Sequence, residues 1–274
     1  MNNFEILICI PARYSSTRLP AKPLQKIAGV EMIRRVAGIA ASICKHNSQC
    51  YCVVATDDER ILAFCRQYDI PVVMTSENCK SGTERCLDAV LQFEKRPELV
   101  INLQGDNPLC PPHFLEQLIQ AWKKDKEAQV FTPFVHLSWE EYDTFKETKK
   151  STPFSGTTAL INQQGYALAF SKTIIPAIRN EEKLRKKLEK SPVCRHIGLY
   201  AYTYGVLKNY FELPPSPYEE PEGLEQMRFL HHQIPVKMVE VDYRGRKSMS
   251  GIDSPEDVVR AERIIAEYGE LNND

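Results

Sequence analysis

Four short apolar segments, each followed by a segment with helical spacing, fill the first half of the chain. The apolar segments cover residues 6–10, 50–56, 72–75 and 99–103. Strands that alternate with helices are joined by right-handed crossovers, which place the strands parallel and the helices on both faces of one sheet. We therefore predict an α/β fold with a mainly parallel central sheet.

The second half of the chain is less regular. Residues 140–154 are polar and predict a loop or a short helix, and residues 181–190 form a run of charges typical of a solvated helix. Since no flexible linker divides the chain, we predict a single domain over residues 1–274, with an excursion of strands and helix inserted over residues 140–248. Four segments of this half have strand-like sequences, namely residues 158–161, 166–171, 197–202 and 237–241.

Composition excludes several classes of function. Of the 274 residues, 43% are hydrophobic and 26% are charged, with a formal net charge of −1, which argues against nucleic acid or an anionic membrane surface as the main partner. The first residues lack the cationic region of a signal peptide, and no apolar stretch reaches the roughly 20 residues of a spanning helix. The nine cysteines form no Cys-x-x-Cys pair, so we expect reduced thiols in a cytoplasmic protein, without a zinc or redox role.

A basic loop follows the first apolar segment. Proline has no N–H for a ladder, so we expect Pro11 to end that strand. The loop then carries Arg13, Arg18 and Lys22 among hydroxyl residues and further prolines, with no acid. Ligands of open α/β sheets bind beyond the carboxyl ends of the strands, so this loop suits a polyanion, most simply a triphosphate. A solvated basic loop is the alternative.

Two acids follow at places where they could meet such a ligand. Asp106 comes just after the apolar segment that ends at residue 103, and Asp253 precedes a helix start. Mg²⁺ takes few protein oxygens and completes its shell with phosphates and water, so two carboxylates near a triphosphate would form a metal–nucleotide site. The alternatives are that Asp106 caps the turn at residues 108–112 and that Asp253 only starts the helix.

The last helix has a clear beginning. Ser254 suits the N-cap, Pro255 the first helical position, and Asp257 supplies an acid in the first turn. The apolar residues expected to pack from this helix are Val258, Val259, Ile264 and Ile265.

Six motifs occur in one order along the chain and cover nearly all of it. They are IPARYSSTRLPAKPL (residues 10–24), KSGTER (80–85), NLQGDNP (102–108), RHIGLY (195–200), LEQMR (224–228) and GIDSPED (251–257). Together they resemble the 3-deoxy-manno-octulosonate cytidylyltransferases, also called CMP-Kdo synthetases. The form of the opening loop separates the chain from the sialic-acid cytidylyltransferases.

The resemblance implies a nucleotidyltransferase, Rossmann-like fold and the reaction of CTP with an acidic sugar to give a CMP-sugar and pyrophosphate. It also implies Mg²⁺ as cofactor, a homodimer formed through the excursion, and a role in bacterial lipopolysaccharide. The residues that it assigns to CTP are Pro11, Ala12, Arg13, Arg18, Lys22, Ser81 and Gln104. Those that it assigns to the sugar acid are Gln104, Lys172, His196, Tyr200, Glu225 and Gln226. Asp106 and Asp253 are the implied metal ligands, and together with Arg13 and Lys22 they are the implied catalytic residues.

Three of the implied sugar contacts have alternative roles. His196 could act as a general base or could only orient the sugar through hydrogen bonds, and the second role is the better prediction. Glu225 and Gln226 suit the recognition of hydroxyl groups, although an exposed polar pair would have the same sequence. No dedicated general base is evident, so positioning and charge neutralisation should supply most of the catalysis.

The chain departs from the family pattern at five positions. Ala21 stands for a glycine, Asn107 for an acid, Thr158 for a lysine, Lys172 for an arginine and Ile178 for an acid. Lysine lacks the bidentate carboxylate recognition of arginine. The identity of the sugar is therefore open between Kdo, a related 3-deoxy-octulosonate, and a nine-carbon acid of the legionaminic or sialic type. A non-catalytic nucleotide-binding relative is the alternative from another class.

Overall fold

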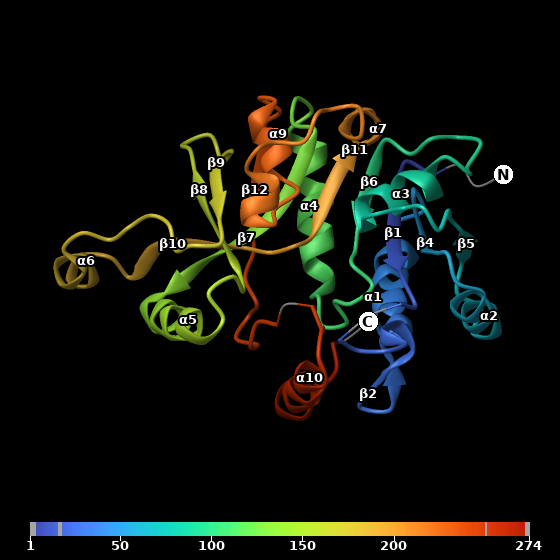
Figure 1. Ribbon diagram of the computed structural model, residues 1–274, viewed down its shortest axis with the longest axis horizontal. Helices are drawn as coiled ribbons and strands as arrows, with labels where there is room; N and C mark the ends of the chain where they lie inside the picture. The colour runs from blue at the N-terminus through green and yellow to red at the C-terminus, as the bar shows by residue number, and fades with distance from the viewer. Residues whose placement is uncertain (1–3, 16–17, 250, 272–274) are drawn as a thin grey trace. The chain divides into compact units, whose positions relative to one another are not determined.

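The computed structural model describes residues 4–15, 18–249 and 251–271, and it divides the chain into two compact units (Figure 1). Residues 16–17 of the basic loop lie outside the described part. The first unit contains residues 1–119, 199–208 and 243–274, and the second contains residues 120–198 and 209–242. The second unit thus begins before the predicted start of the excursion at residue 140, and residues 199–208 belong to the first unit.

The first unit contains the parallel strands expected from the first half of the sequence. β4 pairs with β5 and β1, and β1 pairs with β6, all in parallel, while β11 adds to β6 in the antiparallel direction. This arrangement confirms the α/β fold class. The strands are β1 (Ile6–Ala12), β4 (Cys50–Thr56), β5 (Val72–Met74), β6 (Leu99–Asn102) and β11 (Tyr200–Thr203), and a separate ribbon is formed by β2 (Lys26–Ile27) and β3 (Val30–Glu31).

Helices cover both faces of this sheet. Ile10 lines a small cavity with Ala37 of α1, whereas Asn102, the register partner of Cys9, donates a hydrogen bond to Thr83 of α3 over 3.4 Å. Consecutive residues of a strand point to opposite faces, so α1 and α3 lie on opposite faces of the sheet. The helices that begin in the first unit are α1 (Met32–Lys45), α2 (Glu59–Gln67), α3 (Gly82–Val90), α4 (Pro112–Lys124), α7 (Tyr204–Tyr210) and α10 (Pro255–Tyr268).

The prediction that Pro11 ends the first strand is wrong. β1 is buried along its whole length and continues to Ala12, with Pro11 opposite Ala55 of β4. On its other side β1 pairs with β6 only as far as Cys9, so at Pro11 the strand has one neighbour. Proline is tolerated at such an edge position because its missing N–H removes no ladder bond on the open side.

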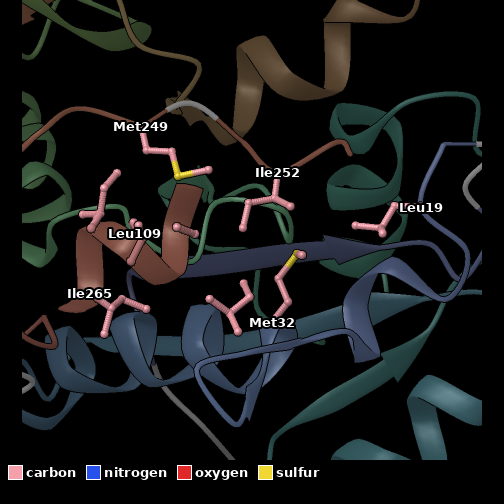
Figure 2. Close-up of a cluster of buried hydrophobic side chains, with 9 residues drawn as sticks. Leu19, Met32, Leu109, Met249, Ile252 and Ile265 are labelled. Carbon is pink, nitrogen blue, oxygen red and sulfur yellow. The ribbon is translucent and has the colours of Figure 1, made fainter. Parts of the chain in front are cut away.

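An apolar cluster fixes α10 against the beginning of the chain (Figure 2). Each fully buried side chain of this size contributes about 1.5–3 kcal/mol, so the cluster holds the segment before α10 beside the basic loop. Ile264, Ile265 and the partly buried Val258 pack on the cluster as expected, whereas Val259 is 47% exposed and Ala261 is buried in the cluster. The buried members are Leu19, Ile27, Met32, Leu109, Met249, Ile252, Ala261, Ile264 and Ile265.

The second unit has a mixed sheet. β7 pairs with β12 in parallel, and the pairs β7–β10, β10–β8 and β8–β9 are antiparallel. The strand predicted over residues 197–202 is correct only in its second half, because residues 197–199 join β10 to β11 and β11 begins at Tyr200. The strand before them was missed since polar residues occupy its buried positions. The strands are β7 (Val130–Ser138), β8 (Thr157–Ile161), β9 (Ala167–Ser171), β10 (Lys190–His196) and β12 (Val236–Glu240).

The helices of the second unit are mostly polar. α5 (Trp139–Ser151) is a full helix rather than a loop, with a capping box between Ser138 and Glu141 but few buried residues, which explains its weak apolar pattern. α6 (Glu181–Lys187) buries no side chain, which confirms the solvated helix predicted there. The remaining helices are α8 (Glu219–Glu222) and α9 (Met227–His231). Over the described ranges, no helix combines the length and the apolar character needed to cross a membrane.

Candidate nucleotide and metal site

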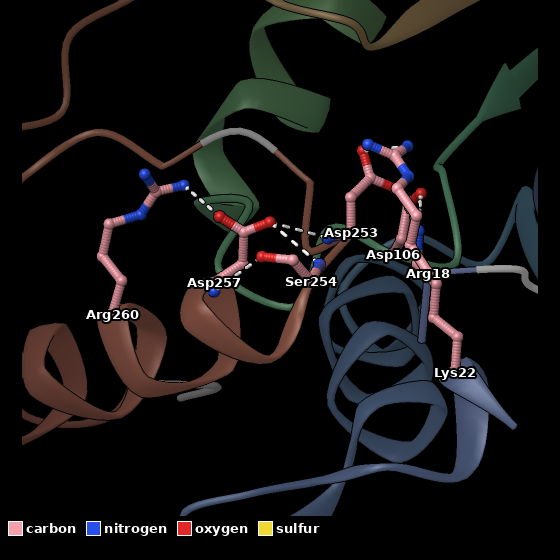
Figure 3. Close-up of polar contacts among 7 residues, drawn as sticks. All are labelled: Arg18, Lys22, Asp106, Asp253, Ser254, Asp257 and Arg260. Atoms are coloured by element: carbon pink, nitrogen blue, oxygen red, sulfur yellow. Dashed lines mark hydrogen bonds and ion pairs between the residues drawn. The ribbon is translucent and has the colours of Figure 1, made fainter. Parts of the chain in front are cut away.

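Lys22 lies between two carboxylates (Figure 3). Ala21 adopts a left-handed conformation, with φ of 52°, and turns the chain into the short helix η1 (Lys22–Leu24). The Nζ atom of Lys22 lies 2.6 Å from Oδ2 of Asp106 and 2.8 Å from Oδ1 of Asp253. The side chain of Lys22 is only 13% exposed. One ammonium group therefore bridges two acids that are far apart in the sequence.

Asp106 is held in position by close packing of the backbone at Gly105 and Gly251. A Cβ atom at Gly105 would lie 2.6 Å from the carbonyl oxygen of Pro11, so only glycine lets the chain pass β1 at this point. A Cβ atom at Gly251 would lie 2.9 Å from Oδ1 of Asp106, and the Asp106 carbonyl accepts a hydrogen bond of 2.8 Å from Ile252 N. Asp106 and the segment before α10 are thus interlocked.

The bond that closes the turn after Asp106 runs from Cys110 N to the carbonyl oxygen of Asn107, at 3.3 Å. The Asp106 carboxylate, in contrast, accepts a hydrogen bond from Lys22. This contact favours the site role of Asp106 over the capping role.

The helix start next to Asp253 is formed by other residues. Ser254 Oγ accepts a hydrogen bond of 3.3 Å from Asp257 N, and Asp257 Oδ2 accepts bonds from the backbone N–H groups of Asp253 (2.9 Å) and Ser254 (3.1 Å). Arg260 pairs with the other oxygen of Asp257 at 2.9 Å. Because the capping is complete without the Asp253 side chain, that carboxylate can face the basic loop.

The charges at this site are paired with each other. Asp253 Oδ2 lies 3.2 Å from Nη2 of Arg18, in an exposed ion pair. Partial burial of Lys22 would by itself lower its pKa, but the charge of Asp106 and the hydrogen bonds to both carboxylates outweigh this effect, so the pKa of Lys22 is raised. Two cations and two carboxylates form a charge-balanced cluster.

The carboxylate pair fits a divalent metal. It already holds one cation between two oxygens, and carboxylate oxygens are ligands that Mg²⁺ prefers. Across the described residues, no three His, Cys, Asp or Glu side chains gather closely enough to hold a metal by themselves. A metal bound here would therefore take its other ligands from water and from a phosphate chain.

Other predicted nucleotide residues lie around the end of β1. A Cβ atom at Gly82 would lie 3.1 Å from Oε1 of Gln104 and 3.2 Å from Cγ of Pro11, so these three residues pack together. Ser81 caps α3 by accepting a hydrogen bond of 3.1 Å from Glu84 N. The guanidinium of Arg13 donates to the carbonyl oxygen of Cys79. Ala12 is also close, because the same Gly105 Cβ would lie 3.6 Å from its Cβ.

Arg85 is a residue of this region whose role the sequence analysis missed. Its side chain is fully buried, and it donates to Thr75 Oγ1 (2.6 Å) and to Asp57 Oδ2 (2.5 Å). Arginine is rarely fully buried unless it is paired. Arg85 therefore ties α3 to the residues that follow β4 and β5. Two features of the sequence could have indicated this role: Arg85 ends the KSGTER motif, and its partner Asp57 directly follows β4.

In the second unit, His196 is buried on β10. Its Nε2 lies 2.8 Å from Thr132 Oγ1. Burial, aided by the charge of Lys172, lowers the pKa of His196 to about 3. The imidazole is neutral at ordinary pH and is a weak base, which favours orientation of a ligand over proton abstraction.

Lys172 directly follows β9 and is fixed through its backbone. The backbone N–H of Lys172 donates to Glu222 Oε2 over 2.7 Å, and the carbonyl oxygen of Lys172 accepts from Lys149 Nζ. The hydroxyl of the neighbouring Ser171 donates to Glu222 Oε1 over 2.8 Å. Burial lowers the pKa of Lys172. Burial, with the charges of Lys172 and Arg195, also lowers the pKa of Lys149 to about 8. Glu222 and Lys149 were missed because their partners are distant in the sequence.

The departure at Thr158 has a structural role. Its hydroxyl donates to the carbonyl oxygen of Thr173 over 2.7 Å and accepts from Ile175 N over 3.1 Å. Thr158 is completely buried. It therefore fixes the turn that follows Lys172 without bringing a charge into the unit.

The remaining predicted sugar contacts are divided between the units. Tyr200 lies in the first unit, where its ring stacks on that of Tyr202 with a centroid distance of 5.7 Å. Glu225 is exposed and Gln226 is 4% exposed, both in the second unit. The Nε2 atom of Gln226 has no hydrogen-bond partner among the described residues. Gln226 thus carries a buried donor that a ligand could satisfy.

Comparison with known proteins shows the family of the chain. A family model described as cytidylyltransferase matches residues 7–240. The chain is 42% identical to the 3-deoxy-manno-octulosonate cytidylyltransferase of Maricaulis maris, over 97% of this chain and 99% of that protein. It is 35% identical to the mitochondrial 3-deoxy-manno-octulosonate cytidylyltransferase of Arabidopsis thaliana, over 94% of this chain and 82% of that protein.

A solved structure extends the likeness to three dimensions. It is a CMP:2-keto-3-deoxy-manno-octonic acid synthetase complexed with CTP, 32% identical in sequence, with a TM-score of 0.82 over 96% of this chain and 99% of that one. This identity extends over nearly the whole of both chains, and the family model matches as well, so sequence and fold indicate the same family. The chain belongs to the cytidylyltransferases and, within them, to the family of the 3-deoxy-manno-octulosonate cytidylyltransferases.

Proposed function

We propose that the protein transfers CMP from CTP to the anomeric hydroxyl of a 3-deoxy-octulosonate, Kdo or a close relative, and releases pyrophosphate. The observation that carries this proposal is the cluster in which Lys22 and Arg18 meet Asp106 and Asp253 at the carboxyl end of β1. Such a cluster offers carboxylates to a metal and cations to a triphosphate. The names of the related proteins supply the nucleotide and the sugar acid.

The first unit would bind and orient the nucleotide. We assign the phosphates to Arg13, Arg18 and Lys22, and a bound Mg²⁺ to Asp106 and Asp253, where it would neutralise phosphate charge and acidify the attacking hydroxyl. The sugar oxygen attacks the α-phosphorus as the bond to pyrophosphate breaks, so the cations stabilise the leaving group. The residues that would border the rest of the nucleotide are Pro11, Ala12, Ser81 and Gln104.

We assign recognition of the sugar acid to the residues that the family resemblance implies. Lys172 would pair with its carboxylate, since the ammonium is partly desolvated. His196, as a neutral imidazole, would orient a hydroxyl group, and the buried amide of Gln226 would donate a hydrogen bond. Tyr200, Glu225 and Gln104 complete the proposed set.

We further propose a homodimer formed through the second unit and a place in lipopolysaccharide synthesis. Phe154 and Leu168 of this unit are 75% and 62% exposed, which suits an interface. Analytical ultracentrifugation would give twice the chain mass if the dimer forms, and a monomer at micromolar concentration would contradict it. All nine cysteines are free, which supports a cytoplasmic location.

The decisive experiment is pyrophosphate release with each of the four nucleoside triphosphates against a panel of acidic sugars, with and without Mg²⁺. We expect turnover only with CTP, with Mg²⁺ present, and with an eight-carbon 3-deoxy-ulosonate. Preference for a legionaminic or sialic type of acid would move the assignment to nine-carbon sugars. Preference for ATP or UTP would refute the base assignment. No turnover with any pair would favour a non-catalytic nucleotide-binding protein.

A further inference from the structure

The Lys22 ammonium lies between the two carboxylates that we assign to the metal. Lys22 Nζ makes its contacts of 2.6 and 2.8 Å with one oxygen of each carboxylate, and Arg18 pairs with the second oxygen of Asp253 at 3.2 Å. The two positive charges equal the two negative ones. The carboxylates are therefore neutralised before any ligand arrives.

We propose that Lys22 is a resident counterion that must leave the two carboxylates before a divalent metal can bind there. Metal binding is then coupled to nucleotide binding, because the triphosphate is the anion that receives the displaced ammonium. This inference deepens the proposed function and rests on it for the identity of the nucleotide. It adds a role for Lys22 as a counterion of the two carboxylates to its role as a phosphate contact.

The backbone around the cluster does not leave the carboxylates free to move apart. Gly251 fits against Asp106 so closely that a Cβ atom would lie 2.9 Å from its Oδ1, and the N–H of Asp253 is held by Asp257. Lys22 is the flexible member, because its Nζ stands at the end of a long side chain that starts at η1. Exchange of the ammonium for a metal thus requires movement of one side chain and no rearrangement of the acids.

Charge explains why the metal alone should bind weakly. A divalent ion placed between the carboxylates would compete with Lys22, and it would add two positive charges to a cluster that is already balanced. Lys22 is only 13% exposed, so its displaced charge would be poorly solvated until an anion arrived. A triphosphate supplies that anion, and by linkage each ligand strengthens the binding of the other.

The test measures Mn²⁺ binding to the nucleotide-free protein by the loss of the free-ion EPR signal, for the wild type and for Lys22→Met. Removing the competing ammonium should tighten Mn²⁺ binding by roughly 10-fold, within the usual range of coupling between two sites. In EDTA, calorimetry with CTP should show weaker binding to Lys22→Met than to the wild type. Thermal unfolding checks the fold, and Lys22→Gln serves as a second neutral variant.

Two matched variants separate the proposal from a general effect of charge. Arg60→Met removes an exposed arginine paired with Asp58, and Lys26→Met removes an exposed lysine paired with Glu31. Neither should change the affinity for Mn²⁺ alone. Equal affinity in the wild type and both Lys22 variants would overturn the proposal, as would equal tightening in all four variants. These titrations need no turnover, so their outcome is separate from that of the pyrophosphate assay.

Discussion

The two units handle buried charge in opposite ways. In the first unit, Lys22 and Arg18 are paired with Asp106 and Asp253, and the pKa of Lys22 is raised. In the second unit, Lys172 is partly desolvated and its pKa is lowered, and the described residues give its ammonium no hydrogen bond. The first region is thus balanced by its own carboxylates, whereas in the second unit the burial of Lys172 outweighs the attraction of Glu222 for its ammonium.

The difference matches what each region is proposed to bind. A phosphate chain arrives with a metal, so its site can be assembled from charges that exchange partners. A sugar acid brings a single carboxylate, and a cation that is already stripped of water needs little further desolvation to accept it. The following four predictions test this contrast, beginning with the largest expected effect.

Asp106→Asn should reduce turnover by more than about 100-fold, because loss of an outer-shell partner of a metal already costs 10–100-fold. The side chain keeps its size, so the fold should persist in circular dichroism. Asp125→Asn, which removes an acid paired with Lys237 in the second unit, is the matched control and should retain turnover. Wild-type rates for Asp106→Asn would refute the metal role of Asp106, and with it the contrast between the two units.

Lys172→Met should raise the KM for the sugar acid by about 10–100-fold, since a hydrogen bond to a charged group contributes about 1.5–3 kcal/mol. The KM for CTP should not change. Steady-state kinetics with each substrate varied in turn would measure both constants, and Lys172→Arg should restore most of the affinity. An equal rise in the two KM values would show that Lys172 does not serve the sugar alone.

Stability in acid should depend on His196. The folded protein keeps this imidazole neutral down to about pH 3, whereas the unfolded chain takes up a proton near pH 6.5. The stabilisation from neutral His196 is therefore complete above about pH 6.5 and is lost as pH falls toward 3. Between pH 7 and pH 5, the free energy of unfolding should fall by about 2 kcal/mol more in the wild type than in His196→Gln. Parallel urea unfolding curves for the two proteins at both pH values would contradict this assignment.

The smallest effect is expected at Ala21, whose φ of 52° is unfavourable for a residue with a Cβ atom. Ala21→Gly should raise the free energy of unfolding by about 0.5 kcal/mol, because the relief of strain slightly exceeds the entropy that glycine loses. Ala63→Gly, at an exposed position inside α2, should instead lower it by about 1 kcal/mol. Denaturant unfolding would show whether the two changes differ in sign.

The sequence predicted the parts of the protein that depend on local patterns. The alternation of apolar and helical segments indicated the parallel sheet of the first unit, and the capping signals at Ser254 and Asp257 located α10. The same patterns predicted that the cations of the basic loop and the acids Asp106 and Asp253 could form one site, and Lys22 contacts both acids.

What escaped prediction depends on partners that are distant along the chain. Arg85 and Glu222 look like ordinary surface charges until Asp57 and Lys172 are seen beside them. β10 was missed because a polar sequence can form a buried strand when its neighbours satisfy its side chains. The place of Pro11 inside β1 was missed for a similar reason. The pairing of β1 with β6 stops at Cys9, so the missing N–H of Pro11 removes no bond on that side, and this cannot be seen from the local sequence.

The separation of Lys22 from Asp253, 231 positions along the chain, has a consequence for synthesis of the protein. Contacts this remote form late, because the intervening chain must first be made and folded. While the chain is still on the ribosome, Lys22 can pair with Asp106, 84 residues away, but the second carboxylate has not yet been made. A nascent chain could therefore hold the basic loop in place without being able to complete a metal site. Activity would begin only when α10 has emerged and docked.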